Sequence, residues 1–406
     1  MNTDKSRTAA GLLADLVLGD HVRAASAVRT VSAARKWPVV VSLARAWRVL
    51  PPVIETLRDL EIELPEDERD LLRRNAQDTA VQSTLVVHRA VRLLGDLETA
   101  GVEAMAFKGV ALIGGLYGNP AHRMISDIDL LIPERSVDVV VEMLRVRGLV
   151  PRSYDSVADY RSHRLGVRSQ NHALSFCDAQ GVETDLHWRL GERPDAVEFV
   201  ESLLDRAVDT PLLGQVIRTP APEDSILLSV HHLIRSDLRL ASLFKDLRDI
   251  LSWCVLRPES WSDRALISRA RDLGMEPAVL ACWEVIAAGN DNERVAEGIG
   301  LFRSCMSADQ IQRATAITRL ILHRIEQGRS NADLVAFYQP GALRRWLRSR
   351  VSGSSGARDH DQPAAAGPSR RVARLVLEIL RQRGFEHRGY RALAAIRSQM
   401  MDRESH

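Results

Sequence analysis

Two aspartates separated by one apolar residue, Asp127 and Asp129, stand near the end of the segment AFKGVALIGGLYGNPAHRMISDIDLLI, residues 106–132. If this end is a strand, residues i and i+2 point to the same face, so both carboxylates lie together and Ile128 faces the other way. Adjacent carboxylates repel each other, and a cation between them relieves that repulsion. Oxygen ligands suit Mg²⁺, which usually binds through one or two carboxylates and the phosphates of a substrate.

An Asp-x-Asp pair alone is short and common, and a solvated strand end is the alternative interpretation. Three neighbouring features favour a site: Lys108 and Gly109 upstream, Arg123 and Ser126 beside the acids, and Asp185 within the apolar stretch VETDLHW. Two acids on one strand and a third on a neighbouring strand suit a two-metal phosphoryl-transfer site. Arg123 would either clamp a phosphate oxygen or anchor the acidic strand.

The elements around these residues predict a small mixed sheet with helices on one face, and hence an α+β fold. Residues 8–100 read as helices that cap the sheet, one of them beginning at Pro65 and running to Leu97. Beyond them we expect strands over 102–107, 127–132, 149–150, 171–177 and 181–188, with helices over 110–117 and 136–147. The last two strands form a hairpin around the turn at residues 178–181.

Alternation along the last strand places Glu183, Asp185 and His187 on one face, so Asp185 can face the acidic pair. His187 has either a direct catalytic role or a tuning role at the edge of the site. A helix over 240–253 carries Lys245 and Asp246 on its charged face. By itself this pattern indicates a solvated face.

Composition divides the 406 residues into several units. We expect an N-terminal helical region (1–100), an α/β core (101–190), a C-terminal helical domain (191–340) and a basic tail (341–406). The tail carries fourteen arginines and six acidic residues, and it contains a flexible Ser/Gly/Pro/Ala-rich linker (351–369) and a basic amphipathic helix (370–384). That helix would pack on the protein or a partner, touch an anionic membrane, or meet RNA.

The remaining composition excludes several classes of protein. The net charge of +2 argues against a protein that coats nucleic acid along its whole length. The four cysteines form no CxxC pair, so neither a zinc ribbon nor a disulfide scaffold is indicated. No signal-peptide pattern and no apolar run long enough for a membrane span are present, which predicts a soluble cytoplasmic protein. Only four lysines occur among 55 basic residues, so Lys108 has a specific role or stands in the motif by chance.

Taken together, the run K-G-x-x-L…Y…R-x-x-S-D-I-D-L-L-I and the later D-L-H-W resemble bacterial nucleotidyltransferases of the DNA polymerase beta-type superfamily. The resemblance covers about residues 40–260 and is nearest to the branch labelled uncharacterised nucleotidyltransferase. It implies that Asp127 and Asp129 are the metal-binding pair and that Asp185 is the third carboxylate. The glycine that faces the phosphates is either Gly109, eighteen residues before Asp127, or Gly114-Gly115, which starts thirteen residues before it.

The resemblance implies an enzyme that uses two Mg²⁺ ions to transfer an NMP from an NTP, such as ATP, to a hydroxyl-bearing acceptor. The acceptor would be a small molecule, sugar or peptide, in a natural-product or surface-polysaccharide pathway. A second possibility is a toxin-type nucleotidyltransferase that modifies tRNA, with the basic tail binding RNA. A third is an inactive accessory protein that binds nucleotide. The binding residues expected beside the three acids are Lys108, Gly109, Arg123, Ser126, Lys245 and Asp246.

Overall fold

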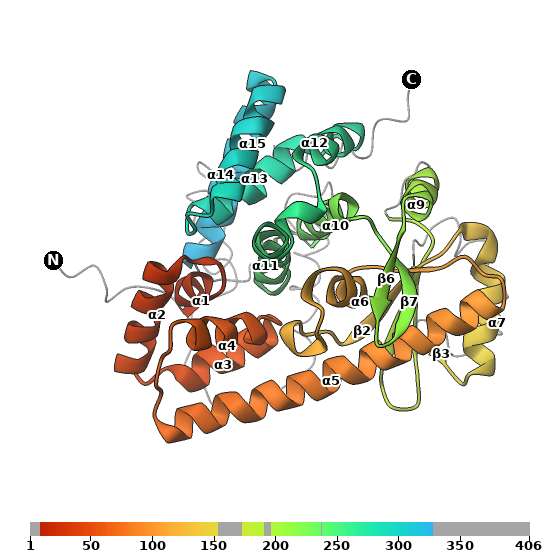
Figure 1. The fold of residues 1–406 in the computed structure, drawn as a ribbon, viewed down its shortest axis with the longest axis horizontal. Helices are drawn as coiled ribbons and strands as arrows, with labels where there is room; N and C mark the ends of the chain where they lie inside the picture. Colours follow the sequence, from red (N-terminus) through yellow and green to blue (C-terminus); the bar gives the residue numbers. More distant parts are fainter. Residues whose placement is uncertain (1–8, 153–172, 191–195, 237, 328–406) are drawn as a thin grey trace, which may run out of the picture.

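The computed structural model describes residues 9–152, 173–190, 196–236 and 238–327. The predicted basic tail, its linker and its amphipathic helix lie outside these residues. Helices predominate, and the described strands form one five-stranded sheet and one two-stranded sheet. The mixed α+β fold predicted from the sequence is therefore confirmed (Figure 1).

The five-stranded sheet has the order β1-β2-β5-β4-β3. Its central strands, β2 and β5, run parallel, and the other neighbouring pairs are antiparallel. The strands are β1 (Met105–Ala106), β2 (Asp127–Leu131), β3 (Val150–Pro151), β4 (Ala173–Cys177) and β5 (Glu183–His187). All five fall within or beside the predicted strands, and β4 and β5 form the predicted hairpin around Gly181, whose φ of +82° suits glycine.

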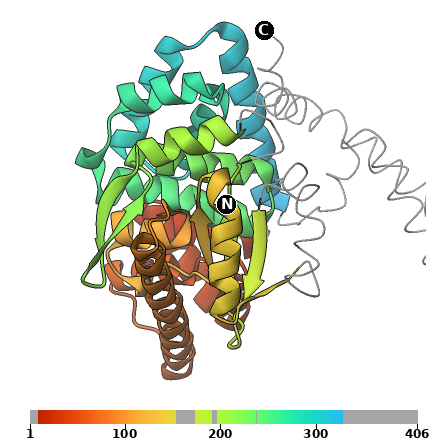
Figure 2. The same ribbon diagram turned by 90° about the vertical axis from the view of Figure 1, so that its right-hand side faces the viewer.

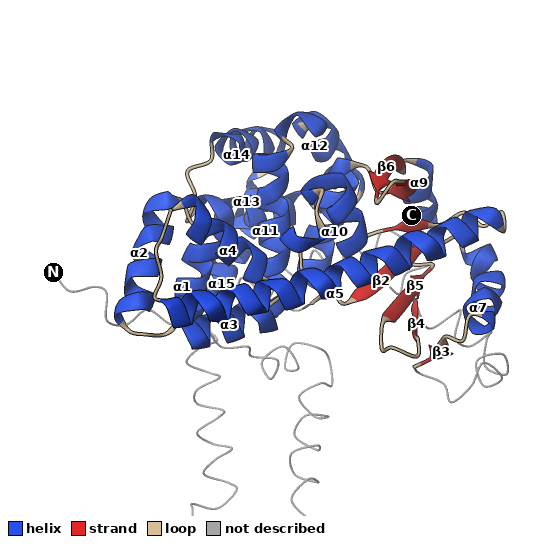
Figure 3. Ribbon diagram, turned by 60° about the horizontal axis from the view of Figure 1, so that its bottom comes forward, coloured by secondary structure: helices blue, strands red, loops and turns tan. Residues whose placement is uncertain are grey.

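The longest helix, α5 (Glu66–Thr99), lies along one side of the molecule (Figure 3). It begins after Pro65. The three acidic side chains in its first turn stabilise the helix by interacting with the positive end of its dipole. The apolar side chains of its second half pack with the sheet residues Ile128 and Leu130 and with α7 (Val137–Val146). Burial of each of these two sheet side chains contributes roughly 1.5–3 kcal/mol.

The opposite face of β2 carries Asp127, Asp129 and Leu131, because alternate residues of a strand point to opposite faces. Leu131 packs with Met105, with Phe107 and with α9 (Ala196–Asp205) in a separate apolar cluster. This cluster covers one end of that face and leaves the two aspartates at the other end. This face of β2 is thus polar at Asp127 and Asp129 and apolar at Leu131.

The first four helices do not form the cap over the sheet that the sequence suggested. Their apolar residues join those of the later helices in one large core, while α5 supplies the contacts to the sheet. The first four are α1 (Ala9–Leu18), α2 (His21–Ala33), α3 (Trp37–Ala46) and α4 (Leu50–Asp59). The later ones are α10 (Pro222–Arg235), α11 (Leu240–Leu256), α12 (Asp263–Asp272), α13 (Glu276–Ala287), α14 (Glu293–Cys305) and α15 (Ala308–Gln327). Viewed from the side, α10 to α15 gather opposite α5 (Figure 2).

Two features between the sheet and the later helices were only partly anticipated. The predicted helix 110–117 is a short α-helix, α6 (Gly109–Leu112), that continues as a π-helical turn, η1 (Ile113–Tyr117). An antiparallel hairpin of β6 (Val208–Leu212) and β7 (Gln215–Thr219), which the sequence did not suggest, packs against η1, β1 and α5.

Among the described residues, no helix is both long and apolar enough to cross a membrane.

Candidate active site

The parallel pairing of β2 with β5 brings the acidic residues together. Asp129 is the register partner of Asp185, and Leu131 is the partner of His187, so these side chains share one face of the sheet. Ligand atoms of Asp129, Asp185 and His187 all lie within 4.8 Å of one another. The predicted meeting of Asp129 and Asp185 is thus observed, and His187 joins them rather than remaining at the edge.

Asp129 is the most deeply buried of the three acids and has two cationic or polar partners. Lys108 Nζ donates to its Oδ1 at 2.5 Å, and His187 Nε2 lies 3.2 Å from the same oxygen. Burial raises the pKa of Asp129, but Lys108 and then His187 outweigh this effect and hold that pKa well below its usual range. Asp129 is therefore ionised at neutral pH. Burial likewise lowers the pKa of Lys108, but Asp129 reverses the shift, so Lys108 stays protonated.

Asp185 is in a different electrostatic situation. Burial and the neighbouring charges of Asp129 and Asp127 raise its pKa, against the opposing hydrogen bond from Ser175 and the charge of Lys108. Its Oδ1 is buried and has no hydrogen-bond partner among the described residues. A buried carboxylate oxygen without a partner is costly. A divalent cation would supply that partner and relieve the repulsion among the acids, so the donor set fits a hard or borderline metal ion.

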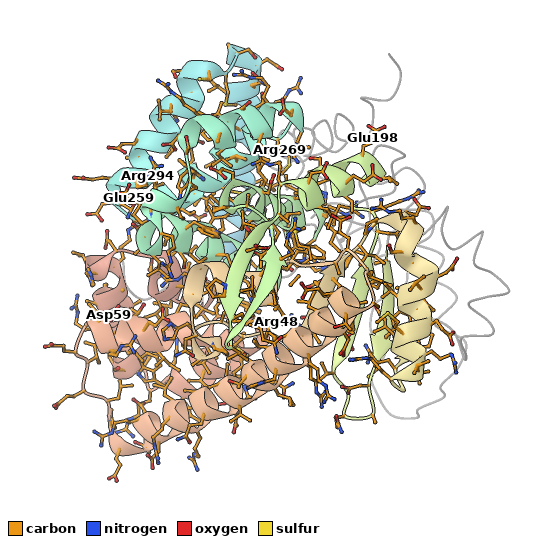
Figure 4. The ribbon with its side chains drawn as sticks, turned by 45° about the vertical axis from the view of Figure 1, so that its right-hand side comes forward. Arg48, Asp59, Glu198, Glu259, Arg269 and Arg294 are labelled. Carbon is orange, nitrogen blue, oxygen red and sulfur yellow. The ribbon has the colours of Figure 1, made fainter. Side chains whose placement is uncertain are left out.

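Asp127 lies at the more open end of the same face. Ser126 Oγ donates to its Oδ1 at 3.3 Å, and Arg48 Nη1 lies 3.6 Å from that oxygen. Arg48 follows α3 and is drawn near the middle of the view in Figure 4, far along the chain from the acids. Sequence patterns carry no signal for this pairing, because Arg48 lies 79 residues before Asp127 in the chain.

Lys108 and Gly109 form the turn between β1 and α6. Lys108 has φ +54° and ψ −124°, a strained conformation for a residue with a side chain, and this directs its ammonium toward Asp129. A Cβ at Gly109 would lie 2.5 Å from Ile125 Cγ2, so the turn packs closely on the segment before β2. Gly114 instead packs against Thr210, and Gly115 faces Trp253.

Asp127 and Asp129 line a cleft of about 300 Å³, and Asp185 lies beside Asp129. One wall holds Asp127, Asp129 and the Lys108–Gly109 turn, and the opposite wall is the start of α11 together with His232 from α10. Basic side chains gather around the cleft: Arg48, Lys108, Arg123, Arg239 and Lys245. A pocket of this size with carboxylates on one side and cations on the other suits a metal-bound polyphosphate.

Arg123 reaches the cleft, but its guanidinium is engaged with the protein. Its Nε and Nη2 donate to the two carboxylate oxygens of Asp249 at 2.8 and 2.7 Å, and its Nη1 donates to the carbonyl of Met124. The hydroxyl of Tyr117 also donates to Asp249. These buried contacts tie the segment before β2 to α11, which favours the anchoring role over the phosphate clamp.

Lys245 lines the cleft and Asp246 lines a smaller adjoining pocket, so neither lies on a solvated face. Asp246 is buried, with Lys245 Nζ 3.4 Å from its Oδ1 and His232 Nδ1 2.7 Å from its Oδ2. Sequence reasoning placed the two residues near the cleft through the resemblance alone. It did not identify His232, because a His-His doublet on an apolar helix carries no signal for a partner fourteen residues later.

Comparison with known proteins agrees with this geometry. A family model described as "Uncharacterised nucleotidyltransferase" matches residues 33–288. A crystal structure described as an antigenic nucleotidyltransferase-like protein from Paracoccidioides brasiliensis is 19% identical, covering 49% of this chain and 91% of that one; its TM-score of 0.27 is too low to carry an argument. The search of curated proteins found no match. The family match spans the acidic strands, the cleft and α10–α11, and the chain therefore belongs to the uncharacterised nucleotidyltransferase family.

Proposed function

We propose that this protein transfers an NMP from an NTP to a hydroxyl-bearing acceptor. The observation that carries the proposal is the convergence of Asp129, Asp185 and His187 from two parallel strands beside a cleft lined with cations. Asp127 adds a fourth potential ligand on the same face. This arrangement, in a member of a nucleotidyltransferase family, supports metal-assisted chemistry on a phosphate substrate.

Asp127, Asp129 and Asp185 would hold the divalent ions, with His187 supporting Asp129. Bound Mg²⁺ ions would neutralise charge on the triphosphate and lower the pKa of the acceptor hydroxyl. Oxygen ligands favour Mg²⁺, and the imidazole beside them also suits Mn²⁺.

The cationic side chains supply the binding energy and the orientation of the triphosphate. Lys108 stands next to the acids, and Arg239, just before α11, and Lys245, on α11, line the same cleft. Catalysis of this kind depends on positioning and on charge stabilisation rather than on a covalent intermediate. The acidic strand keeps its place because Arg123, just before it, is held by Asp249.

The test is incorporation of label from each of the four NTPs, labelled at the α-phosphate, into heat-treated cell extract with Mg²⁺ or Mn²⁺. We expect the full-length protein to label one class of molecule and to release pyrophosphate. Asp127→Asn, Asp129→Asn and Asp185→Asn should each lower the rate by about 10³-fold or more, equivalent to about 4 kcal/mol of barrier. A matched control is Asp209→Asn, since the Asp209 side chain is 76% exposed on β6.

Unchanged labelling in any of the three acidic variants would reject the assignment. Transfer of the γ-phosphate instead of the α-phosphate would replace nucleotidyl transfer by phosphoryl transfer. Digestion of the labelled material with ribonuclease distinguishes a tRNA acceptor from a small molecule, a sugar or a peptide. Metal-dependent NTP binding with no labelling of any fraction would identify an accessory protein.

A further inference from the structure

A histidine that lines the cleft with the acidic strand is bonded to a buried aspartate behind it. His232 is on α10 and Asp246 is on the neighbouring helix α11, and their Nδ1 and Oδ2 atoms are 2.7 Å apart. The Asp246 side chain is 4% exposed, whereas that of His232 is 31% exposed. One end of the imidazole is therefore fixed in the protein interior while the ring remains accessible to a ligand.

The charge of Asp246 determines which nitrogen of His232 carries the proton. Burial raises the pKa of Asp246, but Lys245 and His232 outweigh it, so that pKa lies below its ordinary value. An ionised carboxylate only accepts hydrogen bonds, so Nδ1 of His232 must donate. In the neutral ring the lone pair is then on Nε2, the nitrogen away from Asp246.

His232 belongs to the lining of the cleft that also contains Asp127 and Asp129. It also lines a smaller adjoining pocket, where it meets residues of α6, α10, α11 and the segment before β2. The cations oppose an additional positive charge on the ring and the carboxylates favour one, Asp246 by direct contact. The charged groups that line the two spaces with it are Arg48, Lys108, Arg123, Asp127, Asp129, Arg239, Lys245, Asp246 and Asp249.

The other carboxylates near the cleft have different roles, since Asp127 and Asp185 are assigned to metal binding in the proposed function. Asp129 is bonded to Lys108, and Asp249 is bonded to Arg123. Among the cleft residues described here, His232 combines a lone pair with a buried carboxylate behind the ring. An aspartate that orients an imidazole and stabilises its protonated form is the arrangement that general-base catalysis uses.

We propose that His232 accepts the proton of the attacking hydroxyl and that Asp246 is its positioning residue. This inference rests on the proposed nucleotidyl transfer. The acceptor O–H bond breaks and its proton goes to Nε2, while the acceptor oxygen forms a bond to the α-phosphorus. The bond from that phosphorus to the pyrophosphate oxygen breaks, and pyrophosphate leaves with the electron pair. The imidazolium then returns its proton to solvent.

The experiment measures the initial rate of α-phosphate labelling in heat-treated extract with full-length variants. His232→Ala should lower the rate by about 10²-fold or more, the usual contribution of a general base. Added imidazole should restore part of that rate, and the acidic limb of the wild-type pH–rate profile should be absent from the variant. Asp246→Asn should also lower the rate, because an amide no longer fixes the tautomer or stabilises the imidazolium.

Two comparisons separate proton transfer from binding or folding. The affinity for the NTP, measured by fluorescence with an anthraniloyl analogue, should change less than about twofold in His232→Ala, a small effect on the affinity scale. His231→Gln is the matched control, since His231 adjoins His232 on α10 but does not line either pocket described above.

Labelling by His232→Ala at the wild-type rate would overturn the inference, as would a loss of NTP affinity that accounts for the loss of rate. Failure of imidazole to restore any activity, with an unchanged pH profile, would also count against it. None of these results tests the proposed function, which is tested by labelling with the wild-type protein and with the variants of the three acids.

Discussion

The ammonium of Lys108 lies 2.5 Å from Oδ1 of Asp129, so the most deeply buried acid of the site has a counter-ion within the protein. His187 shares the same oxygen at 3.2 Å. A metal ion that binds Asp129 must therefore compete with Lys108 for this oxygen. The ammonium released in that exchange would lie beside the triphosphate, where it could bind a phosphate oxygen.

Lys108→Met tests this competition. Without the ammonium, a divalent cation has sole access to Asp129, and we expect Mn²⁺ to bind about tenfold more tightly, equivalent to about 1.4 kcal/mol. Labelling should nevertheless fall, because the phosphate loses a cation. Titration calorimetry measures the affinity, with Lys36→Met as a control because Lys36 is exposed and outside the cleft. Weaker Mn²⁺ binding in Lys108→Met would show that the lysine supports the metal site instead.

The pKa values of Asp129 and Asp185 shift in opposite directions. Substituting the two residues should therefore have opposite effects on thermal stability, measured in EDTA so that no metal ion is bound. Asp129 has a lowered pKa, so its contribution to stability is present above its ordinary value of 3.8 and is lost as the pH falls below it. Asp185 has a raised pKa, so its ionisation destabilises the fold as the pH rises from 3.8 through the raised value. At pH 7, Asp129→Asn should lower the melting temperature and Asp185→Asn should raise it.

Thermal unfolding between about pH 3 and pH 8 checks both signs. The difference between Asp129→Asn and the wild type should shrink toward the acidic end. Addition of Mn²⁺ should stabilise the wild type more than Asp185→Asn, because the variant lacks one ionised ligand. A lower melting temperature for Asp185→Asn at pH 7 in EDTA would contradict the electrostatic account.

The buried Arg123–Asp249 pair predicts a strong effect on stability. Removing one partner leaves an unpaired buried charge, so Arg123→Met or Asp249→Asn should each cost about 3–5 kcal/mol. The double variant Arg123→Met/Asp249→Asn should cost less than the sum of the two, since no isolated charge remains. Denaturant unfolding measures these values. Tyr117→Phe, which removes one hydrogen bond to Asp249, should cost about 1 kcal/mol. Near-additive losses in the double variant would exclude the anchoring role.

Gly109→Ala and Gly115→Ala distinguish the two glycines that the sequence left open. A Cβ at Gly109 would lie 2.5 Å from Ile125 Cγ2, so α6 or the segment before β2 must shift and carry Lys108 with it. We expect labelling to fall at least tenfold, about 1.4 kcal/mol of barrier. At Gly115 the nearest atom, in Trp253, lies at an ordinary 3.8 Å, and labelling should be almost unchanged. Equal losses in both variants would mean that the short helix as a whole, rather than the turn, sets the activity.

The strands and most helices could be predicted because their signals are local. Alternation along residues 182–188 placed Asp185 and His187 on one face, and the structure has both of them there. The partner of His187 could not be predicted from that pattern, because it depends on the parallel register between β5 and β2. The register between these strands, whose paired residues are 56 positions apart, is set by the packing of the whole sheet.

The contacts between the two walls of the cleft carry still less local signal. Arg123 and Asp249 are 126 residues apart, and each of them alone resembles an ordinary surface charge. The charged face of α11 reads as solvated because its residues follow helical spacing, yet Asp246 and Asp249 are both buried. Charged residues are rarely buried without partners, and the partners lie on elements that the sequence does not show to be close.

The shared apolar core of α1–α4 and α10–α15 has a consequence for how the chain folds. Leu12 and Leu50 belong to the same apolar core as Ile250 and Leu280, which are 200 or more residues later in the chain. During synthesis α1–α4 therefore leave the ribosome with an exposed apolar surface, because α10–α15, which cover it in the folded protein, are not yet translated. Long-range closure of this kind slows folding and favours aggregation, so the nascent chain is expected to depend on chaperones until its second half is translated.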